Sequence, residues 1–153
     1  MISIREDDLT HPAVLDLLRL HADHMEKWSP PGSCHYFDAE RLRAPDVTFW
    51  TAWDGDQLLA CGALKEVHAG AGEVKSMRTA PETLRRGAGA AILTRMIEEA
   101  RRRGYAELLL ETGRSADFEP SHRLYERFGF KDRGAFAEYS ADDPFKRFMS
   151  RAV

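Results

Sequence analysis

The segment from Glu73 to Arg103 constrains the fold most, because it joins a short strand to a long helix through a loop rich in glycine and arginine. The strand is expected to end near Thr79, and Gly87, Ala88 and Gly89 stand directly before the helix. A helix N-terminus presents unpaired backbone N–H groups and the positive end of the helix dipole. A strand, a glycine loop and a helix in this order therefore predict an anion site, with a pyrophosphate as the expected ligand.

The composition predicts a single globular domain over residues 1–153. The chain is 43% hydrophobic and 31% charged, and its formal net charge of -3 argues against a global field that would attract nucleic acid. Cys34 and Cys61 are too far apart for a C-x-x-C motif and too few for a disulfide framework. We find no signal-peptide pattern and no apolar run near the ~20 residues of a membrane span. We therefore expect a cytoplasmic protein without a membrane or nucleic-acid partner.

The N-terminal third predicts a strand, an amphipathic helix and an irregular loop. Apolar residues recur at helical spacing after Pro12, and His21 shares their face, so we interpret His21 as a core residue rather than a ligand. The prolines and glycine of residues 30–32 exclude regular structure there. Trp28 and His35 in this loop are candidates for binding a substrate, and a surface loop with anchoring aromatics is the alternative.

The middle of the chain predicts an antiparallel meander followed by a parallel unit. Residues 47–53 are β-branched and aromatic, Asp54-Gly55-Asp56 is typical of a hairpin turn, and residues 57–65 return as an apolar strand in which Gly62 indicates a close backbone approach. Residues 73–79 complete the meander. The apolar run 106–111 follows the long helix, which indicates a right-handed βαβ unit. The predicted fold class is α/β (or α+β) with a mixed sheet.

The C-terminal part predicts one more helix and two closing strands. Pro120 begins a helix that runs from Ser121 to Phe128, with Gly129 as its stop. Residues 112–115 are predicted as a turn, and residues 130–133 and 145–149 as strands. Four aromatic residues here suit either a core or the interface of a homodimer, and both readings stay open: Phe136, Tyr139, Phe145 and Phe148.

Three runs in this order, TAPETLRRGAGAAIL, RRGYAELLLET and SHRLYERFGF, resemble the acetyl-CoA-binding core of the GNAT superfamily of N-acetyltransferases. The family's loop pattern is Arg or Gln, two variable residues, Gly, one variable residue, then Gly or Ala. Gly87 and Gly89 match it, whereas Leu84 departs from it at the first position, with Arg85 and Arg86 next to it. The runs HADHMEKWSPPGSCHYFD and AEYSADDPFKRFM further resemble a bacterial branch labelled auxin, or indole-acetic-acid, acetyltransferase-like.

The resemblance implies that acetyl-CoA is the co-substrate and lies between two splayed parallel strands. Backbone groups near the end of the first strand would hold the acetyl carbonyl and the pantetheine, and those of residues 85–90 would hold the pyrophosphate. Small residues are required where phosphate meets backbone. The cofactor-binding residues implied in this way are Met77, Arg78, Thr79, Arg85, Arg86, Gly87, Ala88, Gly89 and Ala90.

Direct transfer requires an uncharged amine, a stabilised oxyanion and a proton for the departing thiolate. Tyr125 matches the family's tyrosine near the CoA sulfur, which implies that it is the acid. Glu73 is our first candidate for the base and Glu111 the second, with an ordered water relay as a competitor. Lys75 and Arg78 alternate with apolar residues on their strand. Either one is a candidate for pairing with a substrate carboxylate, and a solvated strand face is the alternative.

The acceptor predicted from these features is the primary amine of a small molecule, such as an amino acid or a peptide-like compound. Acetylation of protein lysines or N-termini and a non-catalytic acyl-CoA-binding module are the alternatives. A P-loop hydrolase is disfavoured, because no Gly-Lys-Ser/Thr follows the glycines. The scattered histidines and the absence of an H-E-x-x-H motif predict no metal, and no sequence neighbour would activate Cys34 as a nucleophile.

Overall fold

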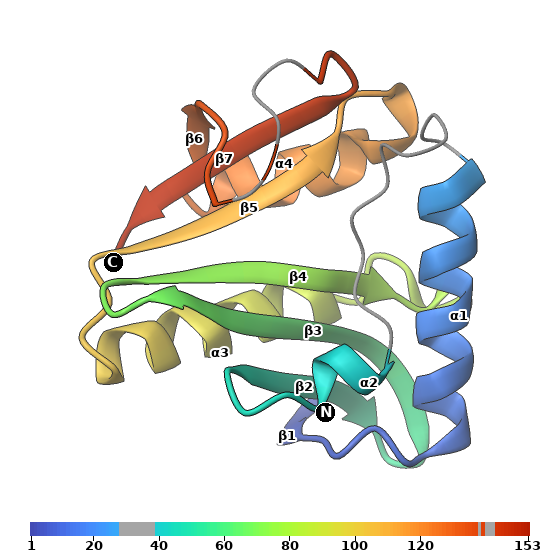
Figure 1. The fold of residues 1–153 in the computed structure, drawn as a ribbon. Helices are drawn as coiled ribbons and strands as arrows, with labels where there is room; N and C mark the ends of the chain where they lie inside the picture. Colours follow the sequence, from blue (N-terminus) through green and yellow to red (C-terminus); the bar gives the residue numbers. More distant parts are fainter. Residues whose placement is uncertain (28–38, 138, 140–142) are drawn as a thin grey trace.

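A seven-stranded mixed sheet organises the described part of the computed structural model, which comprises all residues except 28–38, 138 and 140–142 (Figure 1). The strand order is β1-β2-β3-β4-β5-β7-β6, and β4 and β5 are parallel, whereas the other neighbours are antiparallel. This confirms the predicted meander and parallel unit. The strands are β1 (Ser3–Glu6), β2 (Val47–Asp54), β3 (Gln57–His68), β4 (Ala71–Thr79), β5 (Glu107–Gly113), β6 (Lys131–Arg133) and β7 (Lys146–Ala152).

Helices cover both faces of the sheet (Figure 1). On what we call the front face lie α1 (Pro12–Lys27) and the short α2 (Ala39–Leu42). On the back face lie α3 (Ala88–Arg102) and α4 (Glu119–Arg127). Short 3-10 turns, Pro81–Thr83 and Ala116–Phe118, precede α3 and α4. Gly104 and Gly129, both with positive φ, follow these two helices, as the sequence predicted.

The core of the back face forms where α3 packs on β2, β3 and β4. Trp50, Ile92 and Met96 are almost fully buried in it. A Cβ on Gly62 would lie only 2.5 Å from the Met77 sulfur and 2.7 Å from Met96 Cε. The close approach predicted at this glycine is therefore confirmed, and it holds α3 against β3.

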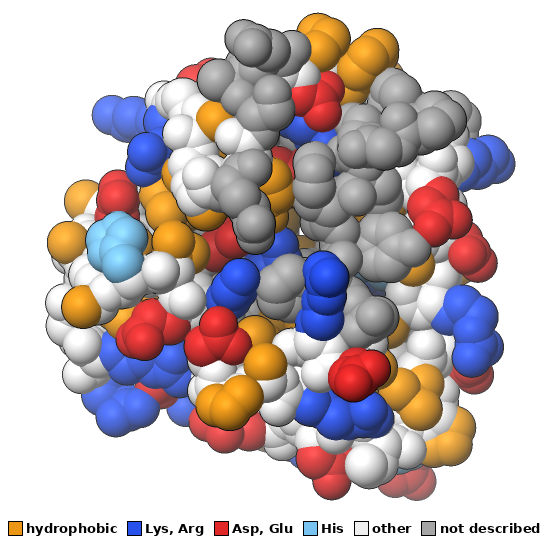
Figure 2. Space-filling model, viewed as in Figure 1, with side chains coloured by type: hydrophobic (Ala, Val, Ile, Leu, Met, Phe, Trp, Pro, Cys, Tyr) orange, Lys and Arg blue, Asp and Glu red, His pale blue; other side chains and the backbone are white. Residues whose placement is uncertain are grey.

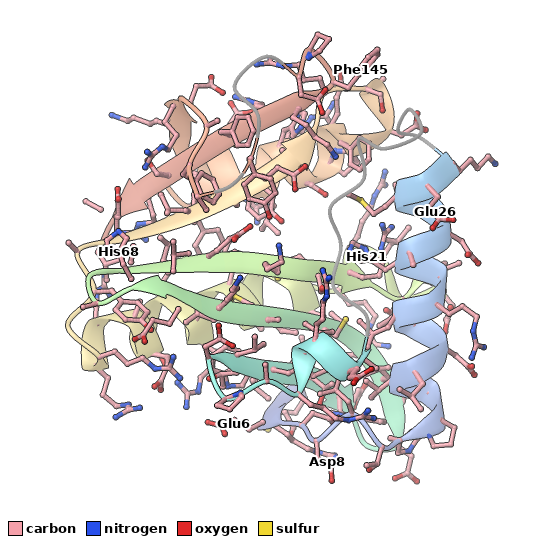
Figure 3. All side chains as sticks on the ribbon, in the orientation of Figure 1. Glu6, Asp8, His21, Glu26, His68 and Phe145 are labelled. Carbon is pink, nitrogen blue, oxygen red and sulfur yellow. The ribbon has the colours of Figure 1, made fainter. Side chains whose placement is uncertain are left out.

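Two smaller clusters fill the front face. One packs α1 and α2 against β2 and β3. The other joins Ala71 and Leu109 to Phe136 and Phe148, which are thus buried in the core of this chain. Phe145, by contrast, is 53% exposed and lies at the edge of the molecule (Figure 3).

One sequence expectation needs correction. The turn predicted at residues 112–115 begins later, because Thr112 and Gly113 still pair with Arg147 and Lys146 of β7 and so extend β5. At the end of α3, Arg103 donates hydrogen bonds to Glu99 and Thr48. Among the described residues, no helix is long and apolar enough to span a membrane.

Candidate active site

The site lies where the parallel strands β4 and β5 separate. Their pairing ends at Val74 and Leu110, and the two strands diverge beyond this point (Figure 1). A cavity of about 320 Å³ occupies this opening and is lined by residues of β4, β5, α1 and α4 and of the loop before α3. Acidic and basic side chains gather around the hollow at the centre of the front face (Figure 2). The cavity therefore connects the α3 loop at the back with ionisable groups at the front.

A β-bulge in β4 decides which side chains face each part of the cavity. Ala63 of β3 pairs with Lys75 and Cys61 pairs with Arg78, so β4 carries one more residue than its partner in this interval. Ser76 lies in the bulge with a φ of +54°. Lys75 and Arg78 both face the front, whereas Met77 packs on the core of the back face. The bulge thus brings two cations to the same face although they are three positions apart.

The N-terminus of α3 forms the back part of the site. Arg85 and Gly87 have positive φ, and no side chain caps the first turn of α3. A Cβ on Gly89 would have no neighbour closer than 3.5 Å, which leaves space beside the first turn. Arg86 instead pairs with Asp54 of the β2–β3 hairpin, so its backbone N–H is the group that it can offer to an anion. Uncapped N–H groups beside open space fit a pyrophosphate.

Tyr125 reaches the cavity from α4. Its ring is buried against Phe130, with 5.7 Å between the ring centroids. Burial raises the pKa of the Tyr125 hydroxyl, and the positive charge of Arg78 partly opposes this shift. The phenol is therefore protonated at neutral pH, as a proton donor must be.

Both candidate bases face the cavity, and each has a lysine partner. Glu73 Oε2 lies 3.2 Å from Lys75 Nζ and accepts a 2.6 Å hydrogen bond from the Tyr139 hydroxyl. Lys75 also donates a 2.8 Å hydrogen bond to Tyr139. Glu111 Oε1 lies 2.8 Å from Lys146 Nζ, with the side chains only 3% and 1% exposed. The two atoms are close but not aligned as a hydrogen bond. The attraction between the opposite charges therefore offsets the desolvation cost of burying them.

Arg78 is held by two histidines of α1. Its Nε donates to His21 Nδ1 and its Nη2 to His24 Nδ1, both at 2.9 Å. Burial, followed by the charge of Arg78, lowers the pKa of His21 to about 3 and lowers that of His24 as well. Both imidazoles are therefore neutral at pH 7 and can act as acceptors. His21 points from α1 toward the sheet (Figure 3).

Three side chains of the site escaped the sequence interpretation. His21 is buried as predicted, yet it also lines the cavity and contacts Arg78. His24 lies three positions after His21 on the same face of the helix, and this spacing predicts that the two imidazoles lie close together. Tyr139 was considered only for core or dimer contacts, and no local pattern links it to Glu73, which lies 66 positions earlier.

Some predicted residues lie outside the described part of the chain, namely Trp28, His35 and Cys34. Within the described ranges, no group of three His, Cys, Asp or Glu side chains could hold a metal ion. The predicted residues that line the cavity are Glu73, Lys75, Met77, Arg78, Thr79, Gly89 and Tyr125. Lys75 also donates hydrogen bonds to Glu73 and Tyr139.

A mixed sheet whose parallel strands part beside a glycine loop and a buried tyrosine forms a cavity suited to an anionic ligand. The comparison with known families identifies the class of protein, since residues 14–130 match the model of the Acetyltransferase (GNAT) family. The chain belongs to this family and is an acyltransferase.

Bacterial relatives align over nearly the full length of the chain. The uncharacterized N-acetyltransferase YsnE of Bacillus subtilis (strain 168) is 49% identical over 98% of this chain and 99% of its own. The IAA acetyltransferase of Azospirillum brasilense is 32% identical over 99% and 98% of the two chains. The resemblance to the branch labelled indole-acetic-acid acetyltransferase-like is thereby confirmed.

The fold also recurs in solved structures. An acyl-CoA N-acyltransferase from Klebsiella pneumoniae matches with a TM-score of 0.79 and 24% identity, covering 99% of this chain and 97% of that one. A GNAT family acetyltransferase from Elizabethkingia anophelis, solved with acetyl-CoA bound, matches with a TM-score of 0.71 and 20% identity over 99% and 98%. These likenesses show that the chain shares the fold of the two solved structures.

Proposed function

We propose that the chain transfers the acetyl group of acetyl-CoA to the primary amine of a small molecule, an amino acid or a peptide-like compound, by direct attack. One observation supports this proposal above the others. A single cavity joins the uncapped N-terminus of α3 to the carboxylates of the front face, and Tyr125 lines it. An anion site, a base and an acid can thus act on one pair of reactants.

The back part of the cavity is the proposed co-substrate site. Backbone N–H groups of residues 85–90 are suited to the pyrophosphate, with Arg85 adding positive charge. Thr79 and Leu124 flank the opening between this loop and β4 and would contact the pantetheine. Bound acetyl-CoA supplies a thioester carbonyl that an amine can attack.

The front part of the cavity is the proposed acceptor site. Glu73 or Glu111 would accept the proton that the amine loses as it attacks, directly or through an ordered water. Tyr125 would donate a proton to the sulfur as the C–S bond breaks, and it would regain this proton from solvent after the thiol leaves. The positive charge of Arg78 lowers the pKa of Tyr125 against the effect of burial, which assists this transfer.

The alternatives differ from this proposal in the acceptor or in the chemistry. A protein lysine or N-terminus would have to enter a cavity of about 320 Å³ that α1 borders on the front. That size favours a compact amine. A non-catalytic acyl-CoA-binding module would need neither the buried tyrosine nor the paired carboxylates. It would bind acetyl-CoA without releasing CoA in the presence of an amine, and an enzyme would release CoA.

Release of CoA in the presence of a panel of amines, amino acids and peptides tests the proposal. We expect Tyr125→Phe to lower kcat by ~10²-fold or more while the affinity for acetyl-CoA stays the same. Tyr105→Phe is the matched control, because it also removes a hydroxyl from a buried ring, here one bonded to Glu66 at the far end of α3.

Each other outcome is informative. Equal CoA release by Tyr125→Phe and the wild type would refute the acid assignment. Turnover with peptides alone would favour the protein acetyltransferase. Tight binding of acetyl-CoA without turnover on any amine would favour the binding module.

A further inference from the structure

The guanidinium of Arg78 is a cation without an acidic partner in the described part of the chain. Its Nε and Nη2 donate to His21 and His24, and both acceptors are neutral imidazoles. No carboxylate among the described residues forms an ion pair with it, and its Nη1 donates no hydrogen bond to them. Burial lowers the pKa of the Arg78 guanidinium, because desolvation disfavours its charged form.

The other cations of this face are compensated. Lys75 pairs with Glu73, and Lys146 pairs with Glu111. These two lysine–glutamate pairs cancel, so the charges that remain at the cavity are those of Arg78 and of Asp117. Asp117 also lines the cavity, but it is exposed and forms no ion pair with Arg78. A partly buried cation of this kind is stabilised when a ligand supplies the anion.

A second polar group beside Arg78 also lacks a partner. Ser76, in the bulge of β4, is 8% exposed and lines the same cavity. Its Oγ has no hydrogen-bond partner among the described residues. A buried hydroxyl is expected to be satisfied, so an unsatisfied one at a cavity wall indicates a polar ligand.

The geometry of Arg78 favours a planar anion. The histidines occupy Nε and one hydrogen of Nη2, which leaves the edge formed by Nη1 and Nη2. That edge matches the two oxygens of a carboxylate. Arg78 lies on the α1 side of β4, whereas the proposed pyrophosphate site lies at the N-terminus of α3 on the other face.

From these contacts we infer that Arg78, with Ser76 beside it, binds a carboxylate of the acceptor, so that the acceptor is an amino acid or a similar amine with an anionic group. The inference rests on the proposed function. It also decides between the two cations that the sequence suggested, because Lys75 already pairs with Glu73, whereas Arg78 has no carboxylate partner in the described ranges.

The test compares amines that differ only in the carboxylate. Leucine, methionine and phenylalanine are each assayed against their carboxamides, and the ratio of kcat/KM is the readout. Hydrogen bonds to a charged group predict a preference for the carboxylate of ~10- to 100-fold. Arg78→Gln should reduce the ratio to about 1, mainly by raising KM for the acid, and Arg78→Lys should give an intermediate ratio. Ser76→Ala should lower the ratio by a smaller factor.

A role of Arg78 in catalysis alone would slow both members of each pair equally and leave the ratio intact, which would overturn the inference. So would equal rates of acid and amide in the wild type. A ratio that survives in Arg78→Gln while acetyl-CoA binds less well would assign Arg78 to the co-substrate instead. Thermal melting confirms that each variant is folded. Lys75→Gln, which removes the other cation, should lower both rates without abolishing the preference.

A second arm does not depend on turnover. Calorimetry with the CoA-loaded protein compares N-acetylphenylalanine with its carboxamide. Tighter binding of the acid in the wild type, lost in Arg78→Gln, supports the inference, and equal binding overturns it. If no amine is acetylated, the proposed function fails, whereas this arm still decides whether Arg78 binds a carboxylate.

Discussion

At the scale of single residues, Glu73 and Glu111 compete for the role of general base. Glu73 Oε2 accepts a hydrogen bond from each of Lys75 and Tyr139, which leaves Oε1 for a substrate. Glu111 Oε1 is fully buried next to Lys146. We favour Glu73, because hydrogen bonds from Lys75 and Tyr139 orient its carboxylate, whereas the Glu111–Lys146 pair is not aligned as a hydrogen bond.

We expect Glu73→Gln to lower kcat/KM by ~10²-fold, since the amide cannot accept the proton that the amine loses. Glu111→Gln, an equally isosteric change, is the control and should keep most of the activity. If both variants keep their activity, the proton leaves through an ordered water. If only Glu111→Gln loses activity, the two assignments are exchanged.

The sequence was informative about these residues where a motif carried them. Tyr125, Glu73 and Arg78 were predicted from a resemblance in short segments, and the structure brings them to one cavity. Their roles stay predictions. Tyr139 could not be predicted, because its contact with Glu73 depends on how the chain after β6 returns across the sheet. The pairing of Arg78 with α1 likewise depends on tertiary packing.

At the scale of the elements, the loop before α3 depends on one left-handed glycine. Gly87 has a φ of +83°, and a Cβ there would meet no atom within 4 Å, so strain rather than a clash is the cost of a side chain. Gly55, in the β2–β3 hairpin, has a φ of +58° and equally open surroundings. The two glycines thus form a matched pair, one at the proposed co-substrate site and one at a turn.

Alanine at either position should cost ~1–2 kcal/mol in the free energy of unfolding. Only Gly87→Ala should also weaken acetyl-CoA binding, because it shifts the N–H groups at the start of α3. Denaturant unfolding and calorimetry measure the two effects. Equal loss of affinity in both variants would show that binding reports stability alone, and unchanged affinity in Gly87→Ala would contradict the predicted anion site.

Elements were predictable where local patterns agreed with the fold. Glycine and proline mark the ends of several elements because of their backbone conformations. Examples are Gly55 in the hairpin turn, Pro12 at the start of α1 and the glycines after α3 and α4. The end of β5 was missed for a different reason. Thr112 and Gly113 have turn propensity, yet pairing with β7 and packing of Phe118 over Gly113 keep them in the strand.

At the scale of the whole molecule, one sheet links both halves of the chain, so we propose that residues 1–153 unfold as a single domain. Cys61 at the centre of β3 can report this. It is fully buried, burial raises its pKa to about 12, and its thiol donates to the Ser76 carbonyl. Reaction therefore requires exposure of the thiol.

In a Cys34→Ser variant, a thiol reagent should label Cys61 with the same denaturant midpoint as the loss of far-UV circular dichroism. Fast labelling under native conditions, or a midpoint well below that of the secondary structure, would show that the first three strands open separately. Light scattering of the same variant measures its molar mass in solution. That mass shows whether the chain forms the homodimer that the C-terminal aromatic residues suggested.

The overall topology was predictable only through the resemblance. Local patterns gave a meander and a βαβ unit, but the position of β7 between β5 and β6 has no signature in either strand. It places Lys146 beside Glu111 and packs Phe148 with Leu109 and Phe136 on the front face.

The single extra residue at Ser76 also limits how enzymes with this strand can diverge. Glu73 and Lys75 face the front before the bulge and Arg78 after it, so the alternation of β4 reverses there. Loss of one residue from the bulge would turn Arg78 toward α3 and Thr79 toward α1. The proposed acceptor site and the proposed co-substrate site would then both be disrupted. Substitution at the front-facing positions disturbs only one half. New acceptor preferences can therefore arise by point mutation on one face of β4, whereas the insertion or deletion of one residue in this strand would disrupt both halves of the cavity.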